Sequence, residues 1–166
     1  MSQFNKTTRF FSVMLVAGGS VGVAMVMILG LKLLPQGWLL LVPLAGLAAL
    51  FAWAAFTGIR LWQGTPYGRR WAPILFASQI PMFSLQGIRY QWFTGAELSP
   101  TVQLGTGSVP LGLSVNLGAN GQFFFGDEAA ELFIGLNLFA VVALVLLLRA
   151  NSSFRARGTA AASTPQ

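Results

Sequence analysis

The chain has 166 residues, of which 55% are hydrophobic and 8% are charged, and its formal net charge is +6. A water-soluble domain carries roughly a quarter charged residues, so this composition argues against an ordinary soluble protein and indicates that lipid surrounds much of the chain. Cysteine and histidine are both absent. Their absence excludes disulfides, Cys/His metal sites, thiolate nucleophiles and imidazole bases.

Four apolar segments predict membrane-spanning helices, each of which needs about 20 residues at a rise of 1.5 Å per residue. They lie at about 10–34, 37–62, 71–91 and 128–149. The first apolar run is far longer than the roughly 7–15 residues of a signal-peptide core, so we expect an uncleaved helix. The predicted fold is an all-α membrane protein in which residues 1–149 form a four-transmembrane-helix bundle.

The basic residues favour one orientation of this bundle, because Lys and Arg concentrate on the cytoplasmic side of membrane proteins. With four spans, one side holds most of them: Lys6, Arg9, Arg60, Arg69, Arg70, Arg149, Arg155 and Arg157. The acids Glu97, Asp127, Glu128 and Glu131 fall on the other side or at its edge. Both termini and the loop 63–70 are predicted to be cytoplasmic, in a plasma membrane and preferably a bacterial inner membrane. Because the positive charges follow helix ends, the expected partner is the lipid bilayer and not nucleic acid.

The outer loop, residues 92–127, has the pattern of a small extracytoplasmic β-hairpin between the third and fourth helices. Apolar residues alternate with small or polar ones from Val109 to Leu117, which is the period of a strand with one apolar face. Asn120 and Gly121 follow and favour a hairpin turn, so the hairpin is predicted at 109–125. Its apolar face is expected to cover helix ends, to enter the lipid headgroups or to bind a partner. The segment 150–166 has little to bury and is predicted to be a disordered cytoplasmic tail.

Small residues in the first two helices predict close helix packing. Gly18 and Gly22 form a GxxxG pair, and Ala48 and Ala52 share a face of the second helix. Small side chains let helix backbones approach each other in lipid. The helices are expected to pack together within one subunit, with self-association as the alternative.

The third helix carries polar side chains at membrane depth. Ser78, Gln79 and Gln86 on this helix, with Asn137 on the fourth, form a candidate polar intramembrane face. Such groups face the protein interior and not lipid. Interhelical hydrogen bonds explain them, and a permeation or ligand pocket is the alternative.

Arg89 and Glu131 are predicted at a similar membrane depth on neighbouring helices. Pairing would offset the cost of placing each charge near hydrocarbon. We therefore expect a structural ion pair at the outer edge of the bundle.

The sequence offers few candidates for chemistry. It contains no phosphate-binding loop, and no catalytic residue, cofactor site or metal site is predicted. The expected function is that of a non-catalytic accessory or partner-binding subunit, which contacts another membrane protein or a copy of itself through the outer β loop or helix faces. The alternative is a small oligomeric channel or transporter that uses the polar face of the third helix. An intramembrane enzyme is disfavoured by the missing His and Cys.

Overall fold

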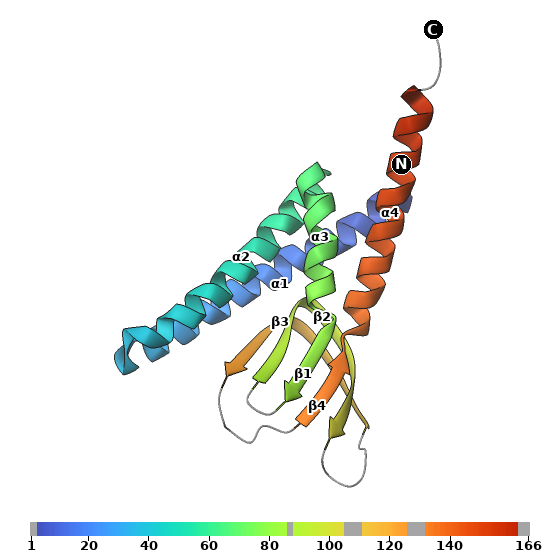
Figure 1. Ribbon diagram of the computed structural model, residues 1–166. Coiled ribbons are helices and arrows are strands. Elements are labelled where there is room, and N and C mark those ends of the chain that lie inside the picture. The colour runs from blue at the N-terminus through green and yellow to red at the C-terminus, as the bar shows by residue number, and fades with distance from the viewer. Residues whose placement is uncertain (1–2, 86–87, 105–110, 126–131, 163–166) are drawn as a thin grey trace.

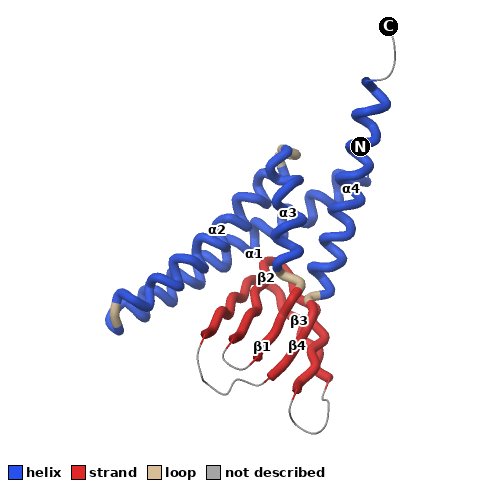
Figure 2. Tube along the Cα trace, viewed as in Figure 1, coloured by secondary structure: helices blue, strands red, loops and turns tan. Residues whose placement is uncertain are grey.

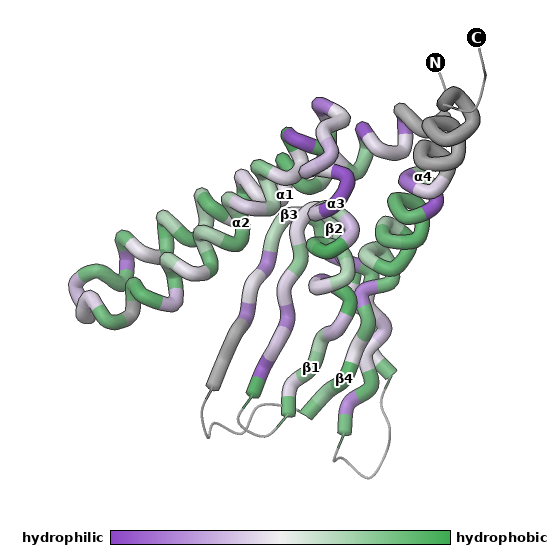
Figure 3. The backbone as a smooth tube through the Cα atoms, turned by 45° about the horizontal axis from the view of Figure 1, so that its top comes forward, coloured by the Kyte–Doolittle hydropathy of each residue, from purple (hydrophilic) through white to green (hydrophobic). Residues whose placement is uncertain are grey.

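The computed structural model describes residues 3–85, 88–104, 111–125 and 132–162. Two long helices, α1 (Gln3–Leu33) and α2 (Leu41–Trp62), form an antiparallel pair joined by short 3-10 turns at Leu34–Gln36 and Trp38–Leu40 (Figure 1). Gly37 separates these turns with a φ of 133°, a conformation that residues with a side chain rarely adopt. Figure 3 shows that the pair is hydrophobic over most of its length.

The third helix, α3 (Pro66–Ser78), is short. The side chain of Thr65 caps its start by accepting a hydrogen bond from the Gly68 N–H at 3.3 Å, and Pro66 occupies the first turn, where it costs no backbone bond. The helix ends before Pro81, and its 13 residues extend only about 20 Å.

A four-stranded antiparallel sheet follows α3 (Figure 2). Its strands are β1 (Pro81–Leu85), β2 (Ile88–Leu104), β3 (Leu111–Phe125) and β4 (Leu132–Leu136), and the order is β1-β4-β2-β3 with an additional β1–β2 pairing. The last helix, α4 (Leu138–Ala162), begins directly after β4. It is helical through much of the segment 150–166 that was expected to be disordered.

The predicted all-α four-helix bundle is therefore wrong, because the structure has an α+β fold. Within the described residues, two helices are long and apolar enough to cross a membrane, Lys6–Leu33 and Leu41–Trp62. The third expected span, 71–91, is divided between α3, β1 and the start of β2. The fourth, 128–149, includes β4, and the apolar part of α4 (Leu138–Ser152) is shorter than a span. Total apolar length misled the prediction, because it does not distinguish one long helix from a helix followed by a buried strand.

The expected hairpin at 109–125 is also wrong in its turn. β3 does form where the residues alternate, but Asn120 and Gly121 lie within it, opposite Phe93 and Trp92 of β2. The connection between β2 and β3 falls at 105–110, outside the described residues. Gly121 has a packing role instead: a Cβ at this position would lie 2.5 Å from Leu47 of α2.

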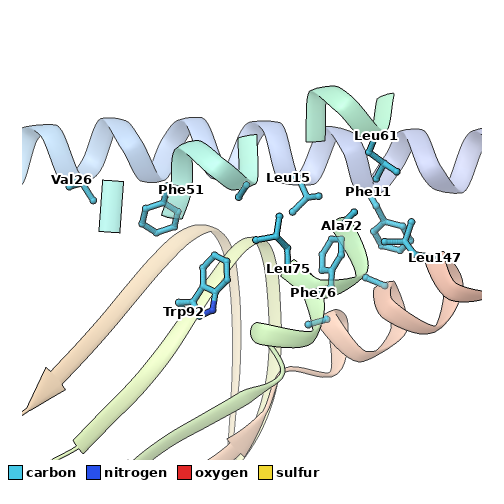
Figure 4. Close-up of a cluster of buried hydrophobic side chains, with 13 residues drawn as sticks. Phe11, Leu15, Val26, Phe51, Leu61, Ala72, Leu75, Phe76, Trp92 and Leu147 are labelled. Carbon is cyan, nitrogen blue, oxygen red and sulfur yellow. The ribbon is translucent and has the colours of Figure 1, made fainter. Parts of the chain in front are cut away.

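The hydrophobic core lies where the four helices meet the upper end of the sheet. Figure 4 shows Phe11 and Leu15 of α1, Phe76 of α3 and Trp92 of β2 together in this region. The rings of Phe11 and Phe76 meet edge to face at 5.6 Å, and those of Phe51 and Trp92 at 6.4 Å. These contacts join the sheet and the helices into one body.

Strand β2 bends sharply in its middle. β1 and β4 are antiparallel to each other, yet both are antiparallel to β2: Tyr90 pairs with Phe83 near one end and Val102 with Ile134 near the other. This is possible only if β2 changes direction between the two pairings. The bend lies at Gly95, whose φ is 93°, and directly opposite on β3 is Gly118, whose φ is 122°.

Helix α1 crosses the sheet at this bend. A Cβ on Gly18 would collide with the Gly95 amide, would lie 2.7 Å from the Thr94 carbonyl carbon and 3.0 Å from the Gly118 oxygen. A Cβ on Gly95 would lie 2.9 Å from the Met14 Cβ. Three glycines, Gly18, Gly95 and Gly118, thus form a backbone crossing that leaves no room for a side chain on Gly18 or Gly95.

We predict that Gly18→Ala lowers the free energy of unfolding by about 1–3 kcal/mol, because the added methyl group meets backbone that cannot rotate away. Gly46→Ala on α2 is the matched control: nothing lies within 4 Å of its Cβ position, and alanine is favoured in a helix by about 1 kcal/mol. Thermal unfolding in detergent measures both variants. Equal unfolding temperatures for the two would contradict the crossing.

Candidate functional site

From Leu111 to Leu117, strand β3 has its large apolar side chains on the exposed side of the sheet. On the outside, Leu111, Leu113, Val115 and Leu117 of β3 are 82, 69, 69 and 81% exposed. Leu98 of β2 lies opposite Val115 and is exposed beside them. We call these five residues the outer sheet face. A sheet surrounded by water has the reverse arrangement, with apolar residues in and polar residues out.

Glu97 occupies the inner side of the same two strands. Its side chain is 1% exposed, and each carboxylate oxygen accepts one hydrogen bond: from the Ser114 hydroxyl at 2.9 Å and from the Asn116 Nδ2 at 3.2 Å. Ser99 is also buried on this side, and its hydroxyl contacts the Met82 sulfur at 3.0 Å. The sequence interpretation missed this cluster and treated Glu97 as an ordinary loop acid. From Glu97 to Leu104 polar and apolar residues alternate strictly, and that signal could have found it.

Gln79 fills a gap at the edge of bent β2. In the middle of this strand, residues 91–100 pair with neither β1 nor β4. The Gln79 side chain, which is fully buried, accepts a hydrogen bond from the Thr94 backbone N–H at 3.1 Å and donates one to the Thr94 hydroxyl at 3.0 Å. The Gln79 side chain thereby supplies the acceptor that a neighbouring strand would otherwise offer to the Thr94 N–H.

Asn137 closes the same edge nearer to β4. Its Oδ1 accepts from the Leu98 backbone N–H at 3.4 Å and from the Ala140 N–H at 3.3 Å, which caps the start of α4. Its own backbone N–H donates to the Ile80 oxygen at 2.9 Å. Its Nδ2 is buried without a hydrogen-bond partner among the described residues.

The remaining members of the predicted polar face have different positions. The Ser78 hydroxyl donates to the Leu75 oxygen, while the Ser78 carbonyl accepts from the Tyr90 hydroxyl at 2.7 Å and from the Trp92 indole at 3.1 Å. Burial raises the pKa of Tyr90, and its hydrogen bond with Trp92 partly offsets this effect. Gln86 lies outside the described residues. Gln79 and Asn137 are both fully buried, and both bond to β2.

The predicted ion pair of Arg89 and Glu131 stays a prediction, because Glu131 lies outside the described residues. Arg89 itself is engaged within the sheet. It donates to the Gln122 Oε1 at 3.2 Å and to the Ser84 hydroxyl at 3.5 Å, and its guanidinium lies 5.9 Å from the centre of the Phe133 ring.

The predicted packing residues lie on different faces. Gly18 contacts the sheet, whereas a Cβ on Gly22 would collide with the Phe51 ring of α2. Ala48 packs on the core and Ala52 is exposed. Gly58, another small residue of α2, packs closely on α1: a Cβ there would lie 2.9 Å from both the Leu15 Cβ and the Ser12 oxygen.

A groove of about 390 Å³ lies between α1 and α2. It is lined by Ser12, Val13, Val16, Ala17, Ile59, Trp62 and Gln63. Its small side chains come from α1. The Arg9 guanidinium lies 5.2 Å from the centre of the Trp62 ring at the same end. We call this feature the α1–α2 groove.

Basic residues gather at this end of the helices. Arg60 is at the end of α2 and stacks over Phe56 at 4.9 Å, and Arg70 is in α3 and stacks over Trp71 at 5.7 Å. The Asn151 side chain of α4 donates to the Arg69 oxygen at 3.0 Å, which holds α4 beside the start of α3. In the described part of the chain, no group of three or more His, Cys, Asp or Glu residues comes together.

We predict that Gln79→Met lowers the free energy of unfolding by about 1–3 kcal/mol, because it keeps most of the side-chain volume but leaves the buried Thr94 N–H without a partner. Hydrogen exchange at the Thr94 amide should accelerate. The exposed Gln63→Met is the control, and its effect should stay within about 0.5 kcal/mol. Unchanged stability and exchange in Gln79→Met would show that the amide does not close the strand edge.

The chain matches no protein-family model, no curated protein and no solved structure. The features available for a functional assignment are therefore the two apolar helices, the α1–α2 groove and the outer sheet face.

Proposed function

We propose that the chain is a non-catalytic integral membrane protein that serves as an accessory subunit, with α1 and α2 as a spanning hairpin and the α1–α2 groove as its contact with a partner membrane protein. The spanning role is supported by the large exposed share of the apolar residues in α1 and α2. Only 28% of the apolar window of α1 and 22% of that of α2 are buried. A core helix of a soluble protein is mostly buried, so these apolar surfaces require another nonpolar surrounding.

The position of α1 in the fold supports a retained span over a signal sequence. Gly18 crosses the sheet, and Phe11 and Leu15 belong to the core. Removing this helix would remove the contact at the bend of β2. These contacts support α1 as a helix that stays in the folded protein and is not cleaved.

The charges support an orientation with the termini in the cytoplasm. Lys6 and Arg9 lie near the start of α1, and Arg60 is at the end of α2, so all three flank the same end of the hairpin. The positive-inside tendency places this end in the cytoplasm. The turn between α1 and α2 is then external.

The α1–α2 groove carries the partner-binding part of the proposal. It opens on the exposed side of two apolar helices, beside Val13 and Ile59, with the buried Ser12 and the small Ala17 among its lining residues. Small residues on such a surface let the backbone of a further helix approach closely. A transmembrane helix of a partner protein fits this chemistry.

The channel or transporter that uses the third helix has less support. It requires a spanning helix with polar side chains free to meet a permeant molecule. α3 has 13 residues, and Gln79 is fully buried with its oxygen and nitrogen both bonded to Thr94. The geometry thus favours an accessory role.

The orientation can be tested with single cysteines, since the chain has none of its own. In right-side-out membrane vesicles, we expect a membrane-impermeant maleimide to label Lys32→Cys at the α1–α2 turn. Gln63→Cys should react only after the vesicles are opened. Labelling of Gln63→Cys in sealed vesicles, or of both positions equally, would contradict the spanning hairpin.

The groove can be tested with a photoreactive diazirine amino acid at Val16, in native membranes. We expect a discrete adduct with one partner protein, because a docked helix brings its side chains into contact with Val16. Met27 is the control: it is 64% exposed on α1 and is not a groove residue. It should yield lipid adducts. Lipid adducts alone from both positions would overturn the partner-binding role and leave the membrane topology intact.

A further inference from the structure

Four aromatic side chains of α2 and α3 form a continuous row near the end of α2. The rings of Phe56 and Tyr67 meet edge to face at 5.5 Å, and those of Tyr67 and Trp71 lie 6.1 Å apart. Trp53 joins the row, with its ring 5.5 Å from Trp71 and its indole N–H donating to the Tyr67 hydroxyl at 3.0 Å. Phe56 and Tyr67 are exposed. None of the four lines the α1–α2 groove, so the row belongs to a separate surface.

Two exposed arginines lie over rings of this row. The Arg60 guanidinium is 4.9 Å from the centre of the Phe56 ring, and the Arg70 guanidinium is 5.7 Å from that of Trp71. A guanidinium over a ring can still direct the N–H donors along its edge to a ligand. One donor of Arg60 contacts the Gln63 Oε1 at 3.5 Å. We call the two arginines and the four aromatic residues the arginine–aromatic surface.

Backbone packing holds the two arginines at one level of the molecule. A Cβ on Gly68 of α3 would collide with the Leu61 nitrogen and would lie 2.5 Å from the Arg60 carbonyl carbon. The start of α3 therefore lies directly against α2 at Arg60, and Arg70 follows Gly68 by two residues. Both cations thus belong to the same end of the helices.

The arginine–aromatic surface has no acidic neighbour in the described part of the chain. The acid within the described ranges is Glu97, which is buried in the sheet and accepts hydrogen bonds from Ser114 and Asn116. Figure 1 shows the sheet beyond the far end of α3, away from the end of α2. A ligand that complements this surface therefore carries negative charge.

We propose that the arginine–aromatic surface binds the phosphate groups of anionic phospholipids. This inference rests on the spanning role of α2 and not on the α1–α2 groove. Arg60 lies two residues before the end of α2 at Trp62, and the ends of a spanning helix lie among lipid headgroups. Phosphate oxygens accept paired hydrogen bonds from a guanidinium. The proposed orientation places this end on the cytoplasmic side, where anionic lipids give the membrane surface a negative potential.

The aromatic rings favour lipid over other anionic partners. A nucleic acid or an acidic protein segment would also complement the arginines. Trp and Tyr, however, concentrate at the headgroup level of membrane proteins, where the ring meets apolar chains and the polar atom meets the headgroups. The Tyr67 hydroxyl accepts from Trp53 and keeps its own proton to donate. The surface thus combines rings for the glycerol and upper acyl region with donors for phosphate.

The test is native mass spectrometry of the full chain in an uncharged detergent, with phosphatidylglycerol and phosphatidylcholine of identical acyl chains as probes. We expect tighter binding of phosphatidylglycerol. The double variant Arg60→Gln/Arg70→Gln should weaken that binding by at least about fivefold, the effect of one basic contact with an anionic lipid surface. Phosphatidylcholine binding should not change. Each single variant should show part of the loss, which keeps the test decisive if the double variant does not fold.

The matched control is Lys6→Gln/Lys32→Gln, which removes the same net charge at two exposed positions outside the arginine–aromatic surface. It should leave the preference for phosphatidylglycerol intact. Equal affinity for the two lipids, or an equal loss in both double variants, would overturn the inference. The vesicle labelling of Lys32→Cys and Gln63→Cys tests the spanning hairpin separately. If that labelling succeeds while the two lipids bind alike, this inference fails alone; if the labelling fails, the spanning role is overturned and the inference loses its basis.

Discussion

The crossing of Gly18 over Gly95 and Gly118 is the contact on which the rest of the fold depends. Backbone meets backbone there, so the contact places the sheet against the middle of α1 without the adjustable spacing that side chains provide. Both sheet glycines have positive φ values, which L-residues with a Cβ adopt at a cost. The same residues therefore bend the hairpin and admit the helix.

The bend has a consequence for the polar side chains. A straight β2 could pair along its whole length on both edges. In the bent strand, residues 91–100 pair with β3 on one edge but with neither β1 nor β4 on the other. Buried backbone N–H groups need hydrogen bonds, and Gln79 and Asn137 supply acceptors for those of Thr94 and Leu98. These two side chains stand at the end of α3 and the start of α4. The residues at which α3 ends and α4 begins therefore also supply the hydrogen-bond acceptors for the unpaired edge of β2.

Some of this could be predicted from the sequence. The α1–α2 hairpin follows from two long charge-poor apolar runs separated by Pro35 and Gly37, and the charges at its ends are plain in the sequence. The burial of Gln79 and Asn137 was also expected. Their partner was not, because polar residues in an apolar segment reveal a need for hydrogen bonds but not the position of the acceptor or donor. Strands β1 (Pro81–Leu85) and β4 (Leu132–Leu136) were missed because each is too short to show a period within a longer apolar stretch.

The alternation in β3 shows a further limit of the sequence. A period of two places Leu111, Leu113, Val115 and Leu117 on one face, but it does not say which medium that face meets. The apolar face was expected to cover helix ends, to enter the lipid headgroups or to bind a partner, and in the structure it is exposed. The burial of Glu97, whose carboxylate accepts hydrogen bonds from Ser114 and Asn116, identifies the other face as the interior. A buried carboxylate needs hydrogen-bond donors, and Ser114 and Asn116 supply them to Glu97. The contacts of Glu97 therefore identify the inner face of these strands, which periodicity alone does not.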